Sequence, residues 1–170
     1  NGPFDLLKKE FPHLEFVRLK GYEINYPRNK QMAIKMAISI PKILKGIRRE
    51  HQELQQIIKE KKIDIVISDN RYGLHSKHAK CIFITHQLFI QAPFGKKLLN
   101  KINHSYLKKF YECWVPDNQD EKNFSGKLSH GQYQLKNVHY VGILSRFNAN
   151  EFKNKEHNYL VTAILSGPEP

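Results

Sequence analysis

The segment that decides the fold is DIVISDNRYGLHSKHAKCIFITHQL, residues 64–88. Two β-rich apolar runs cover 63–68 and 81–85, and polar residues follow each run. Runs this apolar are typical of parallel strands covered on both faces, so we expect both to be central strands of a sheet. In an open parallel sheet, ligands bind beyond the carboxyl ends of the strands. The residues that follow the two runs are therefore predicted to share one cleft.

Six residues with polar or aromatic side chains follow these runs: Asp69, Asn70, Arg71, Tyr72, His86 and Gln87. The carboxylate of Asp69 and the imidazole of His86 suit proton transfer or hydrogen bonding to sugar hydroxyls. The guanidinium of Arg71 suits a phosphate or carboxylate, and the ring of Tyr72 suits stacking on a sugar or base. These residues are predicted to line a binding site, with His86 as the catalytic candidate.

These assignments have structural alternatives. Asp69 or Asn70 can equally cap a turn and satisfy free backbone amides, since Gly73 follows closely. His86 can equally be a hydrogen-bonded residue at the end of a strand. The nine histidines show no zinc-site spacing, and no phosphate-binding glycine motif is present. No metal or cofactor is therefore expected.

The rest of the chain alternates short β-rich runs with helical segments. Further strands are predicted at 14–19, 112–115, 138–141 and 159–165. This alternation is the pattern of an α/β fold with a mainly parallel sheet and crossover helices.

Two long segments have helical character, and a shorter helix followed by a loop opens the chain. Residues 30–61 are predicted to form two helices or one kinked helix, because Pro41 interrupts the segment. In its second part the sheet-packing residues are expected to be Ile43, Ile47, Leu54, Ile57 and Ile58. Residues 96–110 are expected to carry an apolar side made of Leu98, Leu99, Ile102, Tyr106 and Leu107.

The bulk composition limits the classes of partner. The 170 residues include 28 Lys and Arg against 16 Asp and Glu, a formal net charge of +12 that attracts nucleic acid, an anionic membrane or an acidic small molecule. Cys81 and Cys113 lie in apolar runs, where buried thiols in a reducing compartment are expected. No apolar run approaches the roughly 18 residues needed to span a bilayer.

Several short motifs occur together and in order along the chain. They are IDIVISDNRYGLHSKHAKCIFITHQL (63–88), APFGKKLLNKIN (92–103), ECWVPD (112–117), GKLSHG (126–131), YVGILSRF (140–147) and LSGPEP (165–170). This set resembles a bacterial branch of glycosyltransferase family 28. It is similar, more distantly, to the enzyme that completes the lipid-linked peptidoglycan precursor.

The resemblance implies a Rossmann-like three-layer α/β/α domain, the N-terminal half of a glycosyltransferase B-type fold. Residues 1–146 would form the acceptor-side domain without the first strand and glycine-rich loop typical of the family. Residues 147–158 would be a linker, and residues 159–170 the first strand and turn of the donor-binding domain. The chain alone is expected to be inactive, and the donor of the whole enzyme to be a nucleotide-diphosphate sugar.

The matched motifs also imply roles for individual residues of this chain. THQL lies where relatives have a histidine loop at the acceptor, although the distant relative has Glu at the position of Gln87. Arg146 matches an arginine near the donor phosphates. Ser166 and Gly167 match a glycine turn near the donor diphosphate, but Pro168 and Pro170 remove amide donors from it.

The resemblance implies a cytoplasmic enzyme that takes a sugar or lipid-linked acceptor, at the inner face of the membrane. Phe89, Ile90 and Phe94 beside Lys96 and Lys97 suit the headgroup boundary of an anionic membrane. The alternative is that Phe89, Ile90, Phe94 and Leu98 face the core.

Two other functions stay open. A nucleotide-sugar hydrolase or epimerase can share the same fold. A basic nucleic-acid-binding module is the rival from another class, although no recognition motif for DNA or RNA is present and no nucleic-acid partner is expected.

Overall fold

The computed structural model describes residues 2–19, 32–120, 122–132 and 135–145 of the chain. Its helices are α1 (Gly2–Glu10), α2 (Met32–Lys61), α3 (Lys96–Leu107) and the short 3-10 helix η1 (Gly126–Leu128). Its strands are β1 (Ile65–Asp69), β2 (Lys80–Ile84), β3 (Glu112–Val115) and β4 (Val138–Tyr140).

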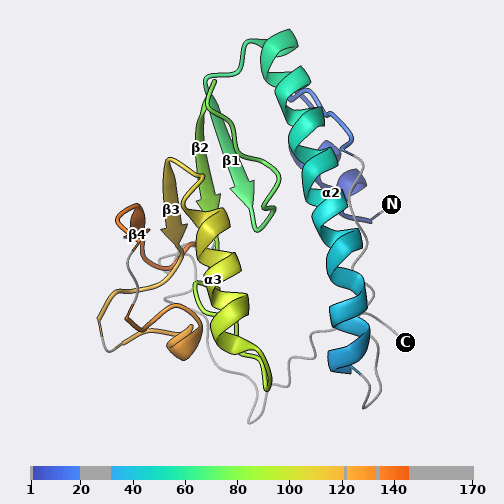
Figure 1. Ribbon diagram of the computed structural model, residues 1–170. Coiled ribbons are helices and arrows are strands. Elements are labelled where there is room, and N and C mark those ends of the chain that lie inside the picture. The colour runs from blue at the N-terminus through green and yellow to red at the C-terminus, as the bar shows by residue number, and fades with distance from the viewer. Residues whose placement is uncertain (1, 20–31, 121, 133–134, 146–170) are drawn as a thin grey trace, which may run out of the picture.

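The described strands form one sheet in the order β1-β2-β3-β4, and each neighbouring pair is parallel (Figure 1). The predicted α/β class and the parallel direction are therefore confirmed. The strands predicted at 63–68, 81–85, 112–115 and 138–141 are confirmed with small shifts of their ends.

The strand predicted at 14–19 is wrong, because this segment has an irregular backbone. Phe16 and Arg18 contact α1, while Leu19 packs against the core and Glu15 pairs with Lys61 of α2. The rings of Phe4 and Phe16 meet edge to face at 5.6 Å, and the guanidinium of Arg18 lies 5.1 Å from the Phe4 ring. The other predicted strand, 159–165, and the linker at 147–158 lie outside the described residues.

Helices α2 and α3 both contribute to the core on one face of the sheet. Leu54 and Ile58 of α2 and Leu107 of α3 form one buried cluster with strand residues such as Phe83 and Val115. Helix α2 continues through Pro41 as a single helix of 30 residues. Its predicted packing stripe is confirmed at Ile47, Leu54 and Ile58, which are buried.

Strand β1 does not have the central position that its apolar sequence predicts. Within the described residues it lies at the edge of the sheet, and Ile65 and Ile67 are 57% and 59% exposed. Their side chains alternate with those of the buried Val66 and Ser68, so they lie on the opposite face. The described residues therefore form two layers, the sheet and the helices on one of its faces. The predicted third layer is not seen within these residues.

The face that α3 buries agrees only in part with the prediction. Leu107 is buried as predicted, whereas Leu98 is 63% exposed and the polar Asn103 is buried. The amide group of Asn103 donates hydrogen bonds to the carbonyl oxygens of Gln87 and Leu88 at 3.2 and 3.0 Å. Hydrogen bonds from the polar Asn103 therefore connect α3 to the segment that follows β2. The apolar pattern alone did not predict this polar contact.

Both cysteines are buried free thiols, as expected. Burial raises the pKa of the Cys113 thiol to about 12, which keeps it protonated. Among the helices that the structure describes, none is both long and apolar enough to cross a membrane.

Candidate functional site

The carboxyl ends of β1 and β2 lie side by side, as the parallel register requires. Asp69 pairs with Ile84, so the next residues on each strand, Asn70 and Thr85, are neighbours. The Thr85 hydroxyl donates a hydrogen bond to Asn70 Oδ1 at 3.2 Å, and the Asn70 amide donates to the Ile84 carbonyl at 3.1 Å. The predicted adjacency of the two polar segments is confirmed.

Asn70 turns the chain sharply where β1 ends. Its φ of 54° lies in the left-handed region, which asparagine tolerates better than most residues other than glycine. The Ser68 hydroxyl then donates to the Arg71 carbonyl at 2.8 Å and closes the turn. The turn sends the following residues back toward α2 and away from the sheet edge.

Asp69 and His86 present their side chains to solvent at this edge. Within the described residues neither side chain has a hydrogen bond or ion pair to the protein. Their functional groups are therefore available to a ligand, next to the fixed pair of Asn70 and Thr85.

Arg71 faces inward, where the prediction had it facing a ligand. Its Nε donates to Glu50 Oε1 at 2.6 Å, and its Nη2 forms an ion pair with the same carboxylate. Glu50 is fully buried on α2, and its Oε2 accepts the amide hydrogen of Gly73 at 3.2 Å. Glu50, Arg71 and Gly73, here called the Glu50 cluster, tie the β1–β2 connection to α2.

Tyr72 also faces inward. Its hydroxyl donates to Asn103 Oδ1 at 2.8 Å, and its ring lies 5.1 Å from the ring of Phe83. Gln87 is half-buried, and its backbone N–H donates to the Thr85 hydroxyl oxygen at 3.0 Å. Of the six predicted residues, Asp69, Asn70 and His86 are thus exposed together at one edge, while Arg71 and Tyr72 connect the edge to the helices.

Asp117 is a third polar group at this edge, and our prediction missed it. It follows β3 and is only 1% exposed. Its carboxylate accepts hydrogen bonds from the Asn118, Phe124 and Ser125 amides at 2.8 to 3.1 Å, and from the Ser125 hydroxyl. Its place shortly after the run ECWV, with only Pro116 between, is the same kind of signal that singled out Asp69 after the run 63–68.

The hydrogen bonds of Asp117 decide its charge state. Burial alone raises the pKa of the Asp117 carboxyl group, but the Ser125 hydroxyl and the three backbone amides together hold this pKa below its usual range. A permanently ionised Asp117 therefore organises the loop that follows β3. The Gly142 amide donates to the Asp117 carbonyl at 3.2 Å, so the chain leaving β4 passes beside it.

Ser129 and His130 extend this network without forming a reactive pair. Ser129 Oγ lies 2.8 Å from His130 Nδ1, and His130 Nε2 lies 2.9 Å from the Asn118 carbonyl oxygen. Because Ser129 is fully buried, a substrate cannot reach its hydroxyl. The network holds the loop in place.

The residues predicted to contact donor phosphates, Arg146, Ser166 and Gly167, lie outside the described residues. Across the ranges that the structure describes, no three His, Cys, Asp or Glu side chains come together as metal ligands.

No protein-family model, curated protein or solved structure matches this chain. The glycosyltransferase resemblance therefore depends on the sequence motifs and not on any of these comparisons.

Proposed function

We propose that this chain is the acceptor-binding part of a nucleotide-sugar-dependent glycosyltransferase, with a Rossmann-like fold of the B type. The observation that supports it best is the polar edge where β1 and β2 end. There Asn70 and Thr85 are hydrogen-bonded to each other, between the exposed side chains of Asp69 and His86. Carboxyl ends of parallel strands are where open α/β sheets bind ligands.

The exposed groups suit an acceptor that carries hydroxyls. In this proposal the Asp69 carboxylate accepts hydrogen bonds from sugar hydroxyls, and the side-chain NH2 group of Asn70 donates to them. His86 takes the proton from the attacking hydroxyl. Gln87 is half-buried next to His86 and limits the site on that side. In this proposal Arg71 and Tyr72 position the loop and do not touch the acceptor.

Arg146, Ser166 and Gly167 remain the predicted contacts of the donor phosphates. A donor-binding half on the same polypeptide would supply the nucleotide-diphosphate sugar, so the chain alone is expected to bind saccharides without transferring them.

Saccharide binding tests the proposed edge directly. In two-dimensional NMR titrations of the chain with N-acetylglucosamine and with glucose, we expect shifts around Asn70 and His86. The His86→Ala variant should bind about three- to tenfold more weakly, since one hydrogen bond is lost. His139→Ala, an exposed histidine on β4, is the matched control and should bind like wild type. Shifts located elsewhere, or unchanged in His86→Ala, would contradict the proposal.

A hydrolase or epimerase on the same fold is distinguished by its products. The assay uses a polypeptide with both this chain and the donor-binding half, and radiolabelled UDP-N-acetylglucosamine. A hydrolase releases free sugar without an acceptor, and an epimerase changes the sugar while it stays on the nucleotide. A transferase consumes the donor when bacterial membrane lipids are added.

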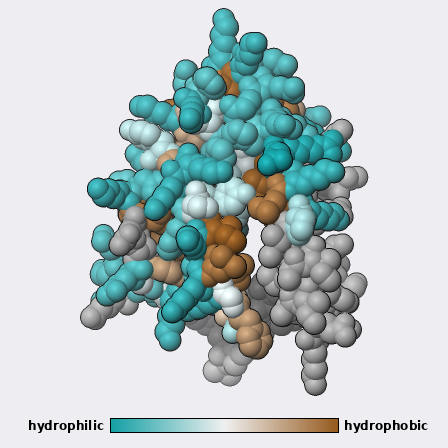
Figure 2. Space-filling view, in the orientation of Figure 1, coloured by the Kyte–Doolittle hydropathy of each residue, from teal (hydrophilic) through white to brown (hydrophobic). Residues whose placement is uncertain are grey.

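We infer that the same chain docks on an anionic membrane surface through α3. Leu98 and Ile102 are 63% and 37% exposed, and their spacing of four residues puts them on one side of α3. Phe94, which precedes the helix, is 79% exposed. Figure 2 shows apolar side chains gathered over α3, beside polar ones. The alternative that Phe94 and Leu98 face the core is wrong, whereas Phe89 does pack against the core.

Flotation with liposomes tests this docking. The exposed lysines of α3, Lys96, Lys97 and Lys101, lie beside the apolar residues and supply attraction to anionic lipid, about 1 kcal/mol each. Wild type should float with phosphatidylglycerol vesicles and not with phosphatidylcholine vesicles. A Phe94→Ser/Leu98→Ser double variant should bind at least roughly tenfold more weakly, since two large apolar groups stay in water.

The matched control removes two apolar side chains from another helix. Leu6 and Leu7 of α1 are 61% and 47% exposed, so a Leu6→Ser/Leu7→Ser variant tests nonspecific adhesion. Equal losses in the two double variants, or no flotation of wild type, would rule out docking through α3.

A further inference from the structure

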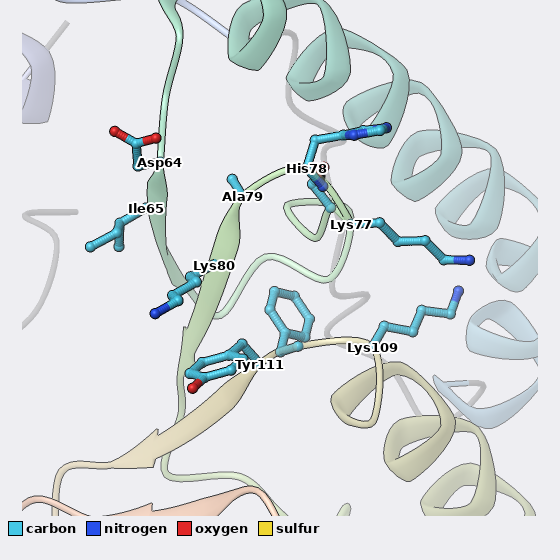
Figure 3. A pocket seen from close by; sticks show the side chains of 10 residues that line it. Asp64, Ile65, Lys77, His78, Ala79, Lys80, Lys109 and Tyr111 are labelled. Atoms are coloured by element: carbon cyan, nitrogen blue, oxygen red, sulfur yellow. Dashed lines mark hydrogen bonds between the residues drawn. The ribbon is translucent and has the colours of Figure 1, made fainter.

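A hollow lies at the amino ends of the strands, at the opposite end of the sheet from Asp69 and His86. It has a volume of about 600 Å³ and is formed by residues 64–65, 76–80 and 109–111 (Figure 3). These segments begin β1, lead into β2 and connect α3 to β3. The volume falls in the range of small-molecule sites.

Positive side chains dominate this hollow. Lys77, Lys80 and Lys109 line it together with His78, and Asp64 is the single acidic residue among its described lining residues. Within the described residues none of the three lysines has a carboxylate partner. The hollow therefore combines several uncompensated ammonium groups in a concave surface, which attracts anions.

The lysines lie at two ends of the hollow. In Figure 3 Lys77 and Lys109 extend in the same direction, toward α2, while Lys80 extends the other way beside Tyr111. Lys80 Nζ lies 5.4 Å from the Tyr111 ring centre, and Lys109 Nζ lies 4.5 Å from the Tyr106 ring centre. Aromatic contacts thus hold two of the ammonium groups in position.

His75 lies next to the hollow, and Lys109 has a small effect on its pKa. Burial, the neighbouring His51 and the positive charge of Lys109 together lower the pKa of His75 from 6.5 to about 4. The His75 ring lies 4.2 Å from that of His51 and 5.9 Å from that of Phe110, which lines the hollow. At neutral pH the wall toward α2 therefore carries the Lys109 charge beside a neutral imidazole.

We propose that this hollow binds a ligand with two or more linked phosphate groups, held by Lys77 and Lys109 at one end and by Lys80 at the other. Ammonium groups bind phosphate as point charges, and cations at two ends suit an extended anion better than a single phosphate. Because the hollow lies across the sheet from the proposed acceptor edge, this inference does not depend on the proposed glycosyltransferase function.

Calorimetric titration with inorganic pyrophosphate at low salt tests the site. Wild type should bind pyrophosphate more tightly than orthophosphate. A Lys77→Gln/Lys109→Gln variant should bind pyrophosphate about tenfold or more weakly, since two charge-assisted contacts are lost. Lys80→Gln should weaken pyrophosphate binding several-fold. Asp64→Asn removes a negative charge from the wall of the hollow and should strengthen pyrophosphate binding.

The control variant has the same change in net charge elsewhere. Lys42→Gln/Lys45→Gln, which changes two exposed lysines of α2 outside the hollow, should bind pyrophosphate like wild type. If this control loses as much affinity as Lys77→Gln/Lys109→Gln, or if wild type does not bind pyrophosphate, the proposal is overturned. Asp64→Asn guards against a folding artefact, because a gain of affinity requires a folded site.

Two further titrations identify the source of the phosphate groups. ADP represents a soluble ligand, and vesicles containing phosphatidic acid represent a lipid headgroup. Binding of ADP that requires Lys77, Lys80 and Lys109 assigns the site to soluble polyphosphates, as proposed. Binding of the vesicles alone, with no binding of pyrophosphate or ADP, overturns that assignment.

Discussion

The Gly73→Ala variant is expected to lose about 3 kcal/mol of unfolding free energy, because this position has no room for a methyl group. A Cβ atom built on Gly73 lies 2.6 Å from Glu50 Cβ, from Glu50 Oε2 and from the carbonyl oxygen of Ile47. The Ile47 oxygen belongs to the backbone of α2, so it cannot rotate away. Urea unfolding followed by circular dichroism measures the loss.

Gly95→Ala is the matched control for this variant. Gly95 has a φ of 68°, and a Cβ atom there meets nothing within 4 Å. The control therefore introduces backbone strain of about 1 kcal/mol without a collision. If both variants lose the same stability, the close approach of Gly73 to α2 is not what destabilises the protein.

The Glu50→Ala variant is also expected to lose about 3 kcal/mol, because it breaks a buried ion pair by removing one partner. Removal of the Glu50 side chain leaves the Arg71 guanidinium without its carboxylate partner and the Gly73 backbone N–H without its acceptor. Since the Arg71 side chain is 36% exposed, water recovers part of its solvation, which places the expected loss at the lower end of the range for such pairs. The same urea unfolding measures it.

A double-mutant cycle separates this pair from the rest of the cluster. Arg71→Ala should cost less in the Glu50→Ala background than in wild type, with a coupling energy of about 1 to 3 kcal/mol. The exposed pair of Arg49 and Glu53 on α2, with Nε and Oε1 3.3 Å apart, is the control and should couple by only about 0.3 to 0.5 kcal/mol. A coupling for Glu50 and Arg71 as small as that of the control would contradict the structural role given to the cluster.

Gly73→Ala and Glu50→Ala are expected to disturb the proposed acceptor edge as well as to lower stability. The Glu50 cluster holds the connection that begins at Asn70, and Asn70 is the residue hydrogen-bonded to Thr85 at the ends of β1 and β2. How the edge presents Asp69 and Asn70 therefore depends on the buried carboxylate of Glu50 on α2.

Several parts of the fold could be predicted because their signals are local. The apolar runs at 63–68, 81–85, 112–115 and 138–141 became strands, and the stripe of Ile47, Leu54 and Ile58 became the packing face of α2. The run at 14–19 has the same alternation, but none of the described strands pairs with it, and its Phe16 packs on α1. A strand needs a hydrogen-bonded partner, which composition does not specify.

The direction of side chains in the site was harder to predict. Glu50 lies three residues after Ile47 and four before Leu54, which places it on the buried stripe of α2 and is a signal for a buried partner. Asn103 occupies a similar position, four residues before the buried Leu107. A search for apolar periodicity does not find such polar residues. They nevertheless form hydrogen bonds with polar groups of the segments that follow β1 and β2.

By itself, the sequence determined the α/β class, the parallel strands and the edge at which Asp69, Asn70 and His86 lie, because backbone preference and hydrophobic periodicity are properties of short segments. Tertiary structure alone decided that Arg71 pairs with Glu50, that Tyr72 bonds to Asn103 and that Lys77, Lys80 and Lys109 surround one hollow. These contacts join residues far apart in the chain, and their formation depends on how the helices pack on the sheet.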